Sequence, residues 1–335
     1  MNIDIGVDLG TDSVVIYSEG KGITLSEPSL VAYNIKKKKA VAIGSEAAQM
    51  LGKAPPYIKI IRPLENGSIS DFKMAEVLLK GLLTKIFGNL FFKPTVAMCV
   101  PSGITGIERS AFISTALAAG ARQVILIEAP LASAIGCGID FKVSRGNMIV
   151  DIGAGSTDIA VVSFGGVVDS HSERTGGYDM DEAIIEYVLK EKKVLIGQRT
   201  AEAAKIKIGT LLEDADTEET EVKGVSTITD LPASVKITNR EISEAIAPTA
   251  ERITKAIHTL FEKTPPELTG DILENGIILT GGTALTRGID KFISVRLGVK
   301  VRVMDDAINR VAIGTGTCFK VTDDLIDASF EEAGI

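Results

Sequence analysis

Short apolar runs alternate with amphipathic stretches along most of the chain. The runs TVAMCVPS (95–102), QVILIEA (123–129), NMIVDIG (147–153) and NGIILTGG (275–282) have the length of strands and end at or beside Pro, Gly or Ser. The stretches between them carry apolar residues at helical spacing, and they predict helices near 72–87, 106–119, 130–138, 179–192, 200–209, 240–262 and 284–297. Strands that alternate with helices in this way predict an α/β fold.

Four shorter patterns refine this prediction. Thr105 and Glu108 have the spacing of a capping box at the start of a helix. The four lysines at 36–39 indicate a hairpin tip, where charge also protects a strand edge. An acidic loop at 213–224 leads into a β excursion at 225–238, and the acidic tail after Phe319 is expected to be partly disordered.

Length and composition limit the possible classes of protein. A chain of 335 residues exceeds the usual size of one hydrophobic core, so we expect two domains. The chain is 45% hydrophobic but only 5% aromatic, without Trp, so the core is aliphatic. We expect no transmembrane helix, because no run of about 18 apolar residues lacks a charge. No signal-peptide pattern opens the sequence.

Charge and reactive residues exclude further classes. The net charge of −8 argues against nucleic acid as the main partner. The three cysteines lie in apolar runs and are expected to be core thiols in a reducing cytosol. The two histidines lie far apart in sequence, which makes a zinc site or a Ser-His-Asp triad unfavourable.

One segment of the chain is echoed by another. Residues 4–20 read DIGVDLGTDSVVIYSEG and residues 147–166 read NMIVDIGAGSTDIAVVSFGG. Aligning Asp8 with Asp151 also aligns Gly10 with Gly153 and Ser13 with Ser156. Both copies predict a strand, a turn of the form Asp-apolar-Gly with hydroxyl residues, and a second strand. A duplicated domain is the simplest explanation.

The echoed turns have the chemistry of anion sites. Backbone N–H groups and hydroxyls at a glycine turn bind phosphate, and the Asp that ends each strand can hold a hydrated Mg²⁺. An ordinary glycine hairpin is the alternative for either copy alone, and two copies in register make it less favourable. The glycine-rich strand-to-helix turn ILTGGTALTRG (278–288) also suits a nucleotide, but it matches neither the Rossmann nor the P-loop pattern.

Together these motifs resemble the actin, sugar-kinase and heat-shock ATPase superfamily, and within it the MreB family of bacterial actins. The resemblance covers about residues 3–318. It rests on segments that include DLGT (8–11), IRPLENGSISDF (61–72), CVPSGITGIERSA (99–111), GARQVILIEAPLASAIG (120–136), MIVDIGAGSTDIAVVSFGGVV (148–168), QRTAEAAKIKIG (198–209) and VAIGTG (311–316).

The resemblance implies an actin-like fold, that is, a duplicated, ribonuclease H-like, two-domain ATPase with four subdomains. Domain I would span 1–141, with subdomain IA and an insertion, IB, at about 30–71. Domain II would span 142–310, with subdomain IIA and an insertion, IIB, at about 177–240. Residues 311–335 would return to domain I and form the acidic tail.

The resemblance also implies roles for individual residues, with ATP or ADP and Mg²⁺ as cofactors. The phosphate hairpins would be Thr11, Asp12 and Ser13 in the first copy and Gly153, Gly155, Ser156 and Thr157 in the second. Asp8 and Asp151 would hold Mg²⁺ through water. Glu202 and Lys205 would contact the adenosine, although the residues alone favour a solvated helix face for both, and the adenine turn would be Gly281, Gly282 and Thr283.

Several residues depart from the family pattern. Asp12 places an extra carboxylate beside a phosphate, which is unfavourable unless the side chain points away or faces Mg²⁺. Ala154, Ser156, Asp158 and Thr283 replace the usual Gly, Thr, Glu and Gly. Where the family reads Glu-Glu-Pro, this chain reads Glu128-Ala129-Pro130. Because Ala129 stands where a carboxylate would position the attacking water, we expect weak ATPase activity, with Glu128 as the remaining catalytic candidate.

The function implied is that of a bacterial cytoskeletal protein, cytoplasmic and peripheral at the inner face of the cell membrane. It would polymerise with itself, in filaments that pair antiparallel, and serve cell shape, morphogenesis or motility. Leu90, Phe91 and Phe92 lie together on a connection and predict insertion into an anionic membrane surface, with burial at the start of a strand as the alternative. No nucleic-acid partner is expected. A metabolic phosphotransferase of the sugar- or acetate-kinase type is the alternative function, and a chaperone-like ATPase is a third.

Overall fold

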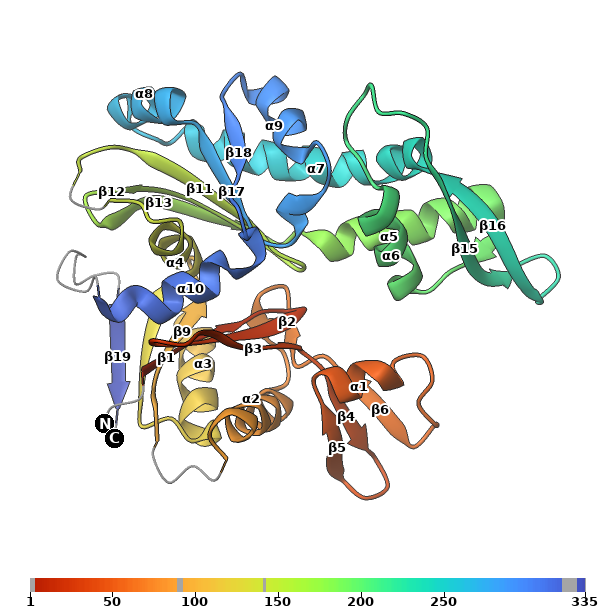
Figure 1. Cartoon of the computed structure of the whole chain (residues 1–335), viewed down its shortest axis with the longest axis horizontal. Helices are drawn as coiled ribbons and strands as arrows, with labels where there is room; N and C mark the ends of the chain where they lie inside the picture. Colours follow the sequence, from red (N-terminus) through yellow and green to blue (C-terminus); the bar gives the residue numbers. More distant parts are fainter. Residues whose placement is uncertain (1–3, 89–92, 141–142, 321–329, 335) are drawn as a thin grey trace.

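Two large sheets dominate the computed structural model, which describes residues 4–88, 93–140, 143–320 and 330–334 (Figure 1). The first sheet has the order β19 (Phe330–Gly334), β10 (Gln123–Glu128), β9 (Thr95–Val100), β1 (Asp4–Leu9), β2 (Ser13–Ser18), β3 (Gly22–Pro28). The second has the order β13 (Gly166–Glu173), β12 (Thr157–Ser163), β11 (Asn147–Ile152), β17 (Ile277–Thr280), β18 (Val301–Val303). Apart from the extra edge strand β19 in the first sheet, the two sheets have the same strand order when one of them is read in reverse.

The pairing directions repeat as well as the order. In each sheet the echoed strand, β1 or β11, pairs antiparallel with the next strand of its hairpin and parallel with a strand from later in the chain. The outer neighbours follow the same rule, since β3 and β13 are antiparallel and β10 and β18 are parallel. The duplication predicted from the sequence echo is therefore confirmed at the level of topology.

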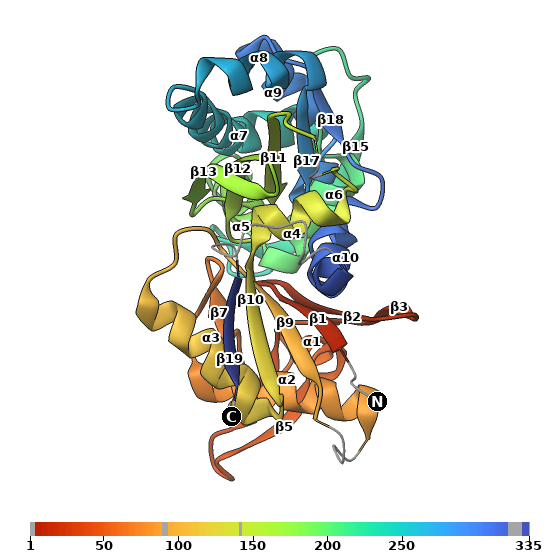
Figure 2. The ribbon, with the colours of Figure 1, turned by 90° about the vertical axis from the view of Figure 1, so that its left-hand side faces the viewer.

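Helices cover the outer faces of both sheets and fill the space between them. The outer helices of the first sheet are α2 (Phe72–Phe87) and α3 (Gly106–Ala119). Those of the second are α5 (Gly177–Tyr187), α7 (Asn239–Phe261), α8 (Pro266–Asn275) and α9 (Ile289–Leu297). Between the sheets lie α4 (Ala129–Gly136) and α10 (Arg310–Thr317), as Figures 1 and 2 show.

The smaller sheets lie beside the large ones. One contains β5 (Lys39–Ile43), β4 (Val31–Asn34) and β6 (Ile58–Ile61), with α1 (Ser45–Met50) packed on it, and is followed by the two-stranded β7 (Leu64–Glu65) and β8 (Ser68–Ile69). The other contains β14 (Val194–Leu195), β15 (Glu219–Ser226) and β16 (Pro232–Thr238), next to α6 (Gln198–Ile208). Single helical turns occur at Val188–Lys192, Thr283–Leu285, Ala307–Asn309 and Cys318–Lys320.

The contact between α4 and α10 is unusually close because it is made of glycine and alanine. A Cβ added to Gly314 would lie 1.7 Å from the carbonyl oxygen of Ala132, and one added to Gly136 would lie 2.0 Å from that of Arg310. The two backbones therefore touch directly, and no larger residue fits at either glycine. This crossing joins the two sheets through a shared aliphatic core.

Most predicted elements are confirmed, including the helices at 72–87 and 106–119, the capping box of Thr105 and Glu108, and the turn at the four lysines. Two predictions need correction. The helix predicted from 284 begins only at Ile289, because Gly288 takes a left-handed φ of 79°. Strand β15 begins at Glu219, inside the predicted acidic loop, because it pairs with β16. Within the acidic tail, residues 330–334 form a strand on β10.

Candidate nucleotide-binding site

The two echoed turns face each other across a cavity between the large sheets. Each turn is closed by the same hydrogen bond, from Gly10 N to Ser13 O at 3.0 Å and from Gly153 N to Ser156 O at 2.9 Å. They are close enough that a Cβ on Gly155 would lie 3.1 Å from the Thr11 side chain. Glycine at this point lets the two turns approach each other and leaves their N–H groups open to an anion.

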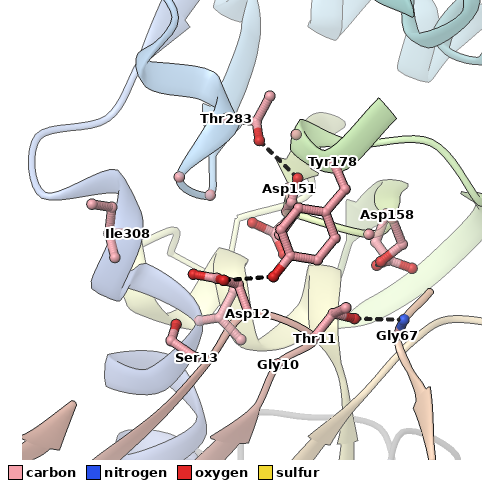
Figure 3. Close-up of a pocket in the computed structure, with 18 of the residues that line it drawn as sticks. Gly10, Thr11, Asp12, Ser13, Gly67, Asp151, Asp158, Tyr178, Thr283 and Ile308 are labelled. Carbon is pink, nitrogen blue, oxygen red and sulfur yellow. Dashed lines mark hydrogen bonds between the residues drawn. The ribbon is translucent and has the colours of Figure 1, made fainter. Parts of the chain in front are cut away.

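The cavity between the turns has a volume of about 460 Å³. That volume falls in the range of small-molecule and cofactor sites. Of the predicted residues, those that line it are Asp8, Thr11, Asp12, Ser13, Ala129, Asp151, Gly153, Gly155, Ser156, Glu202, Lys205, Gly281, Gly282 and Thr283 (Figure 3). The structure therefore brings together in one cavity residues that are as far apart in sequence as 8 and 283.

Two predicted residues lie outside the cavity lining. Thr157 is fully buried, and its hydroxyl donates to the carbonyl oxygen of Thr175 at 2.7 Å. Glu128 accepts a hydrogen bond from Ser102 Oγ at 2.9 Å, whereas its neighbour Ala129 lines the cavity with 5% of its surface exposed. Ala129 thus presents a methyl group to the cavity, whereas the carboxylate of Glu128 points toward Ser102.

Three aspartates face the cavity beside the turns. Desolvation by the surrounding protein raises the pKa of Asp8 to about 7, with a smaller contribution from Asp158. Desolvation likewise raises the pKa of Asp151 to about 8, and the nearby Asp158 and Asp8 add to the effect. For the buried Asp158, desolvation outweighs its hydrogen bonds and raises the pKa to about 6. A cation bound beside these carboxyl groups would favour their ionised forms.

The carboxyl groups fit a hydrated Mg²⁺ better than a metal held by protein alone. Nowhere in the described ranges do three His, Cys, Asp or Glu side chains gather closely enough to hold a metal ion. Mg²⁺ usually takes one or two carboxylates and completes its shell with water and phosphate oxygens. Asp8 and Asp151, one at the end of each echoed strand, supply that set.

The Asp12 side chain contacts residues of two other segments of the chain. Its carboxylate accepts a hydrogen bond from the Tyr178 hydroxyl, which itself accepts one from Arg62 (Figure 3 shows the first). Arg62 also lies 3.6 Å from the Asp12 carboxylate and 4.8 Å from the centre of the Tyr178 ring. We call Asp12, Tyr178 and Arg62 the cross-cavity bridge. It explains why a carboxylate is tolerated at position 12.

Lys205 is fixed by two contacts on the opposite side of the cavity. Its ammonium lies 2.7 Å from the buried carboxylate of Asp181 and donates to the carbonyl oxygen of Gly177 at 2.8 Å. The solvated helix face considered for this residue is wrong, because only 11% of the Lys205 side chain is exposed. Lys205 thereby links α6 to the beginning of α5.

The glycine turn after β17 closes this side of the cavity. Gly281 has a φ of 86°, and a Cβ there would lie 2.3 Å from the carbonyl oxygen of Ile152. Thr283 Oγ1 donates to Gly153 O at 2.8 Å, which ties this turn to the second echoed turn. A residue with a side chain at 281 would therefore push the turn away from β11.

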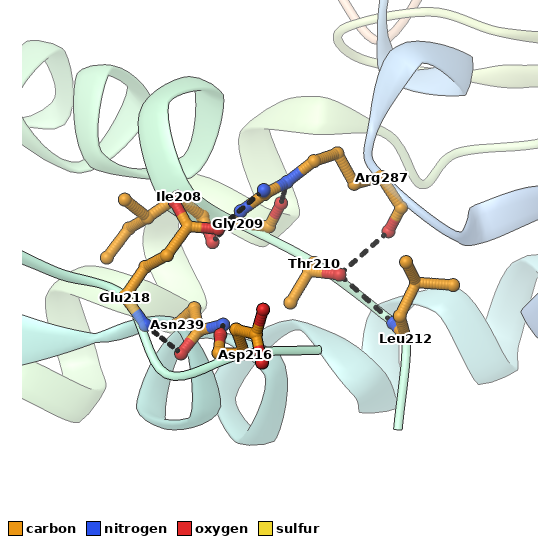
Figure 4. A network of polar contacts seen from close by, with 8 residues as sticks. All are labelled: Ile208, Gly209, Thr210, Leu212, Asp216, Glu218, Asn239 and Arg287. Atoms are coloured by element: carbon orange, nitrogen blue, oxygen red, sulfur yellow. Dashed lines mark hydrogen bonds and ion pairs between the residues drawn. The ribbon is translucent and has the colours of Figure 1, made fainter. Parts of the chain in front are cut away.

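A polar network holds the end of α6 against the segment that follows this turn (Figure 4). Arg287 donates to the carbonyl oxygens of Ile208 and Gly209 and pairs with Glu218 at 2.7 Å. Arg287 also lines the cavity. The network fixes the helix that carries Glu202 and Lys205 relative to Gly282 and Thr283.

Sequence reasoning missed Tyr178, Asp181, Arg287 and Ile308, all of which line the cavity. The predicted membrane residues Leu90, Phe91 and Phe92 lie outside the described residues. Across the described ranges, every helix is too short or too polar to cross a bilayer.

Comparisons with known proteins agree with this architecture. The family description MreB/Mbl protein matches residues 2–327. The cell shape-determining protein Mbl of Bacillus subtilis is 42% identical over 323 residues, covering 96% of this chain and 97% of Mbl. The cell shape-determining protein MreB of Escherichia coli is 41% identical over 326 residues, covering 96% of this chain and 94% of its own length.

Solved structures show the same fold. MreB5 of Spiroplasma citri bound to ADP superposes with a TM-score of 0.91 at 36% identity, covering 97% of this chain and 98% of MreB5. The same protein bound to AMPPNP gives 0.90 at 36% identity, covering 96% and 97%. A MamK double helical filament subunit gives 0.80 at 20% identity, covering 96% and 99%, which supports the fold alone. The predicted actin-like fold is confirmed.

Proposed function

Because the chain belongs to the MreB/Mbl protein family, we propose that it is an ATP-binding cytoskeletal protein that assembles with copies of itself and helps determine cell shape. The observation that carries this proposal is the pair of opposed glycine turns in one cavity with Asp8 and Asp151. Relatives at 41–42% identity are cell shape-determining proteins, and MreB5, at 36% identity, has been crystallised with ADP and AMPPNP. The phosphotransferase alternative has no comparable support.

Each side of the cavity has a separate role in binding. The backbone N–H groups of the two turns, with the hydroxyls of Thr11, Ser13 and Ser156, bind the phosphates. Asp8 and Asp151 hold Mg²⁺ through water, and the ion, when bound, neutralises phosphate charge. Lys205, Glu202 and the turn at Gly281–Thr283 enclose the adenosine.

Hydrolysis is slow in this proposal. Ala129 faces the cavity where a carboxylate would orient the attacking water, and the Glu128 carboxylate is turned to Ser102. Positioning and charge stabilisation supply most of the catalysis in phosphoryl transfer. The chain would therefore bind nucleotide and respond to it while turning it over slowly.

The remaining proposals concern organisation in the cell. We keep the domain boundaries at 1–141, 142–310 and 311–335, with insertions at about 30–71 and 177–240. The protein would form protofilaments in the cytoplasm, paired antiparallel, at the inner face of the membrane. Leu90, Phe91 and Phe92 would insert into the bilayer, and a filament would repeat this weak contact many times.

Nucleotide binding and assembly can be tested together. Purified protein should bind a fluorescent ATP analogue and pellet in Mg-ATP. The variant Ser13→Ala should bind about tenfold more weakly, because one hydrogen bond to a charged group is lost. The control Thr259→Ala, on α7 outside the cavity, should bind normally. If the wild-type protein neither binds the analogue nor pellets, the proposed function is wrong.

Membrane insertion needs its own test. Replacing both Leu90 and Phe91 with Ser should abolish sedimentation with vesicles, since the insertion depends on apolar surface. Unchanged sedimentation with vesicles would refute the role of this connection and leave nucleotide-dependent assembly unaffected.

A further inference from the structure

Positive charge is concentrated in one segment of an otherwise acidic chain. Residues 30–62, here called the basic segment, contain six lysines and one arginine but only one acidic residue, Glu46. Its net charge is therefore +6 in a chain whose total is −8, which leaves −14 for the remainder. Such a separation of charge is informative about binding partners.

Three of the four consecutive lysines, Lys36, Lys37 and Lys38, lie on a turn whose shape is fixed, and Lys39 begins the strand that follows it. The turn joins β4 to β5, and the side-chain oxygen of Asn34 accepts hydrogen bonds from the backbone N–H groups of Lys36 and Lys37, at 3.0 and 2.9 Å. Asn34 is only 6% exposed, whereas Lys36–Lys39 are all exposed. The rigid turn and the start of that strand thus hold four ammonium groups outward from the sheet.

These charges have no acidic partner in the described part of the chain. Arg62 pairs with Asp12, but none of the six lysines of the basic segment forms an ion pair with a described residue. Adjacent unpaired charges repel each other, so they do not stabilise the fold. Protection of the sheet edge explains Lys39, which begins edge strand β5, but not the three lysines on the turn itself.

Exposed apolar side chains accompany the lysines. Ile35 is 50% exposed and Tyr57 is 42% exposed, and the backbone N–H of Ile35 donates to the carbonyl oxygen of Tyr57 at 3.0 Å. The ammonium of Lys36 lies 5.3 Å from the centre of the Tyr57 ring. Lysine beside an amphipathic aromatic and an aliphatic residue is the combination found at membrane interfaces, where charge meets headgroups and apolar groups enter below them.

We propose that the Lys36–Lys39 turn, with Ile35 and Tyr57, is a docking surface for a lipid bilayer that carries anionic headgroups. This inference rests on the membrane association proposed above and adds a second, electrostatic contact to it. The β4–β5 turn projects at the same end of the molecule as the start of β9, as Figures 1 and 2 show.

The test compares two charge-matched variants of the full chain. One replaces Lys36, Lys37, Lys38 and Lys39 with Gln. The control replaces four exposed lysines of the other half of the molecule, Lys255, Lys263, Lys291 and Lys300, with Gln. Flotation is measured with vesicles of phosphatidylcholine alone or mixed with phosphatidylglycerol, at low and high salt, and pelleting in Mg-ATP is measured without lipid.

We expect the first variant to bind phosphatidylglycerol vesicles about 600-fold more weakly at low salt, at roughly fivefold for each of the four lysines, and the control to bind normally. Salt should remove the difference between them. Replacing the same four lysines with Arg should preserve binding, which separates loss of charge from loss of fold. Both Gln variants should pellet normally in Mg-ATP.

Three outcomes would overturn the proposal. The first is equal flotation of the wild type and the Lys36–Lys39 variant. The second is wild-type flotation that does not depend on phosphatidylglycerol. The third is loss of lipid-free pelleting in the Lys36–Lys39 variant alone, which would assign the turn to a contact with a second copy. In the first two outcomes, normal pelleting would leave the proposed assembly function standing.

Discussion

Placing a carboxylate at position 129, where the cavity has only the methyl group of Ala129, should accelerate ATP hydrolysis. Ala129 is the first residue of α4 and lines the cavity, so the side chain of an Ala129→Glu variant would project where the Cβ already points. Glu128 does not supply this group, since its carboxylate accepts a hydrogen bond from Ser102. The variant would therefore add a proton acceptor that the cavity corner lacks.

The structure limits the size of the gain. A well-placed general base contributes about 10²- to 10⁴-fold. The new carboxyl would join Asp8, Asp151 and Asp158, whose pKa values are already raised by desolvation, so part of it would stay protonated at neutral pH. We therefore expect about a 10- to 100-fold increase in rate, which lowers the barrier by about 1.4 to 2.7 kcal/mol.

Single-turnover formation of phosphate, measured after acid quenching with protein in excess over Mg-ATP, reports the hydrolysis step without product release. An Ala129→Gln variant has a similar size but no base, and it should stay near the wild-type rate. Glu128→Gln in the wild-type background should also change little. Equal rates for wild type and Ala129→Glu, together with a large loss in Glu128→Gln, would show that Glu128 reaches the water and that the reasoning here is wrong.

Three further predictions test other parts of the structure. Tyr178→Phe removes the hydroxyl at the centre of the cross-cavity bridge, so a fluorescent ATP analogue should dissociate several-fold faster in stopped-flow, and an unchanged rate would mean that the bridge does not retain nucleotide. Gly314→Ala should lower the free energy of unfolding in urea by about 3 kcal/mol through overpacking, whereas Gly270→Ala, with open space on α8, should raise it by up to about 1 kcal/mol because Ala favours a helix more than Gly. Because Asp8 and Asp151 have pKa values of about 7 and 8, the folded protein keeps protons that the unfolded chain has released. Stability without nucleotide or metal should therefore fall as pH rises from about 5 to 8, and a flat profile would contradict those pKa values.

Local chemistry made the two opposed glycine turns predictable from sequence. An Asp-apolar-Gly turn with hydroxyl residues carries its signal within a few residues, and its repetition at Asp8 and Asp151 identified the duplication. The glycine turn at 281 was predictable for the same reason, since glycine after a buried strand marks a positive φ or a close backbone approach, and Gly281 has both.

Long-range contacts account for most of what was missed. Asp12 and Tyr178 are 166 positions apart and Arg62 and Tyr178 are 116 apart, so no local pattern connects them. The charge of Asp12 was therefore interpreted as a problem for phosphate binding, when its partners lie on other elements. Helix α10 was missed for a related reason, because its two glycines lower helix propensity and the helix is stabilised by its contact with α4.

The α4–α10 crossing has a consequence for how assembly and chemistry communicate. Helix α4 has eight residues and is about 12 Å long, with Ala129 in the cavity at one end and Gly136 locked against α10 at the other. A tilt of about 5° at the locked end would move the cavity end by about 1 Å. Since a displacement of that size changes the rate of a positioned reaction, the turnover of each subunit would report the angle between its two halves. A filament that fixes this angle would thereby set a common rate for all its subunits.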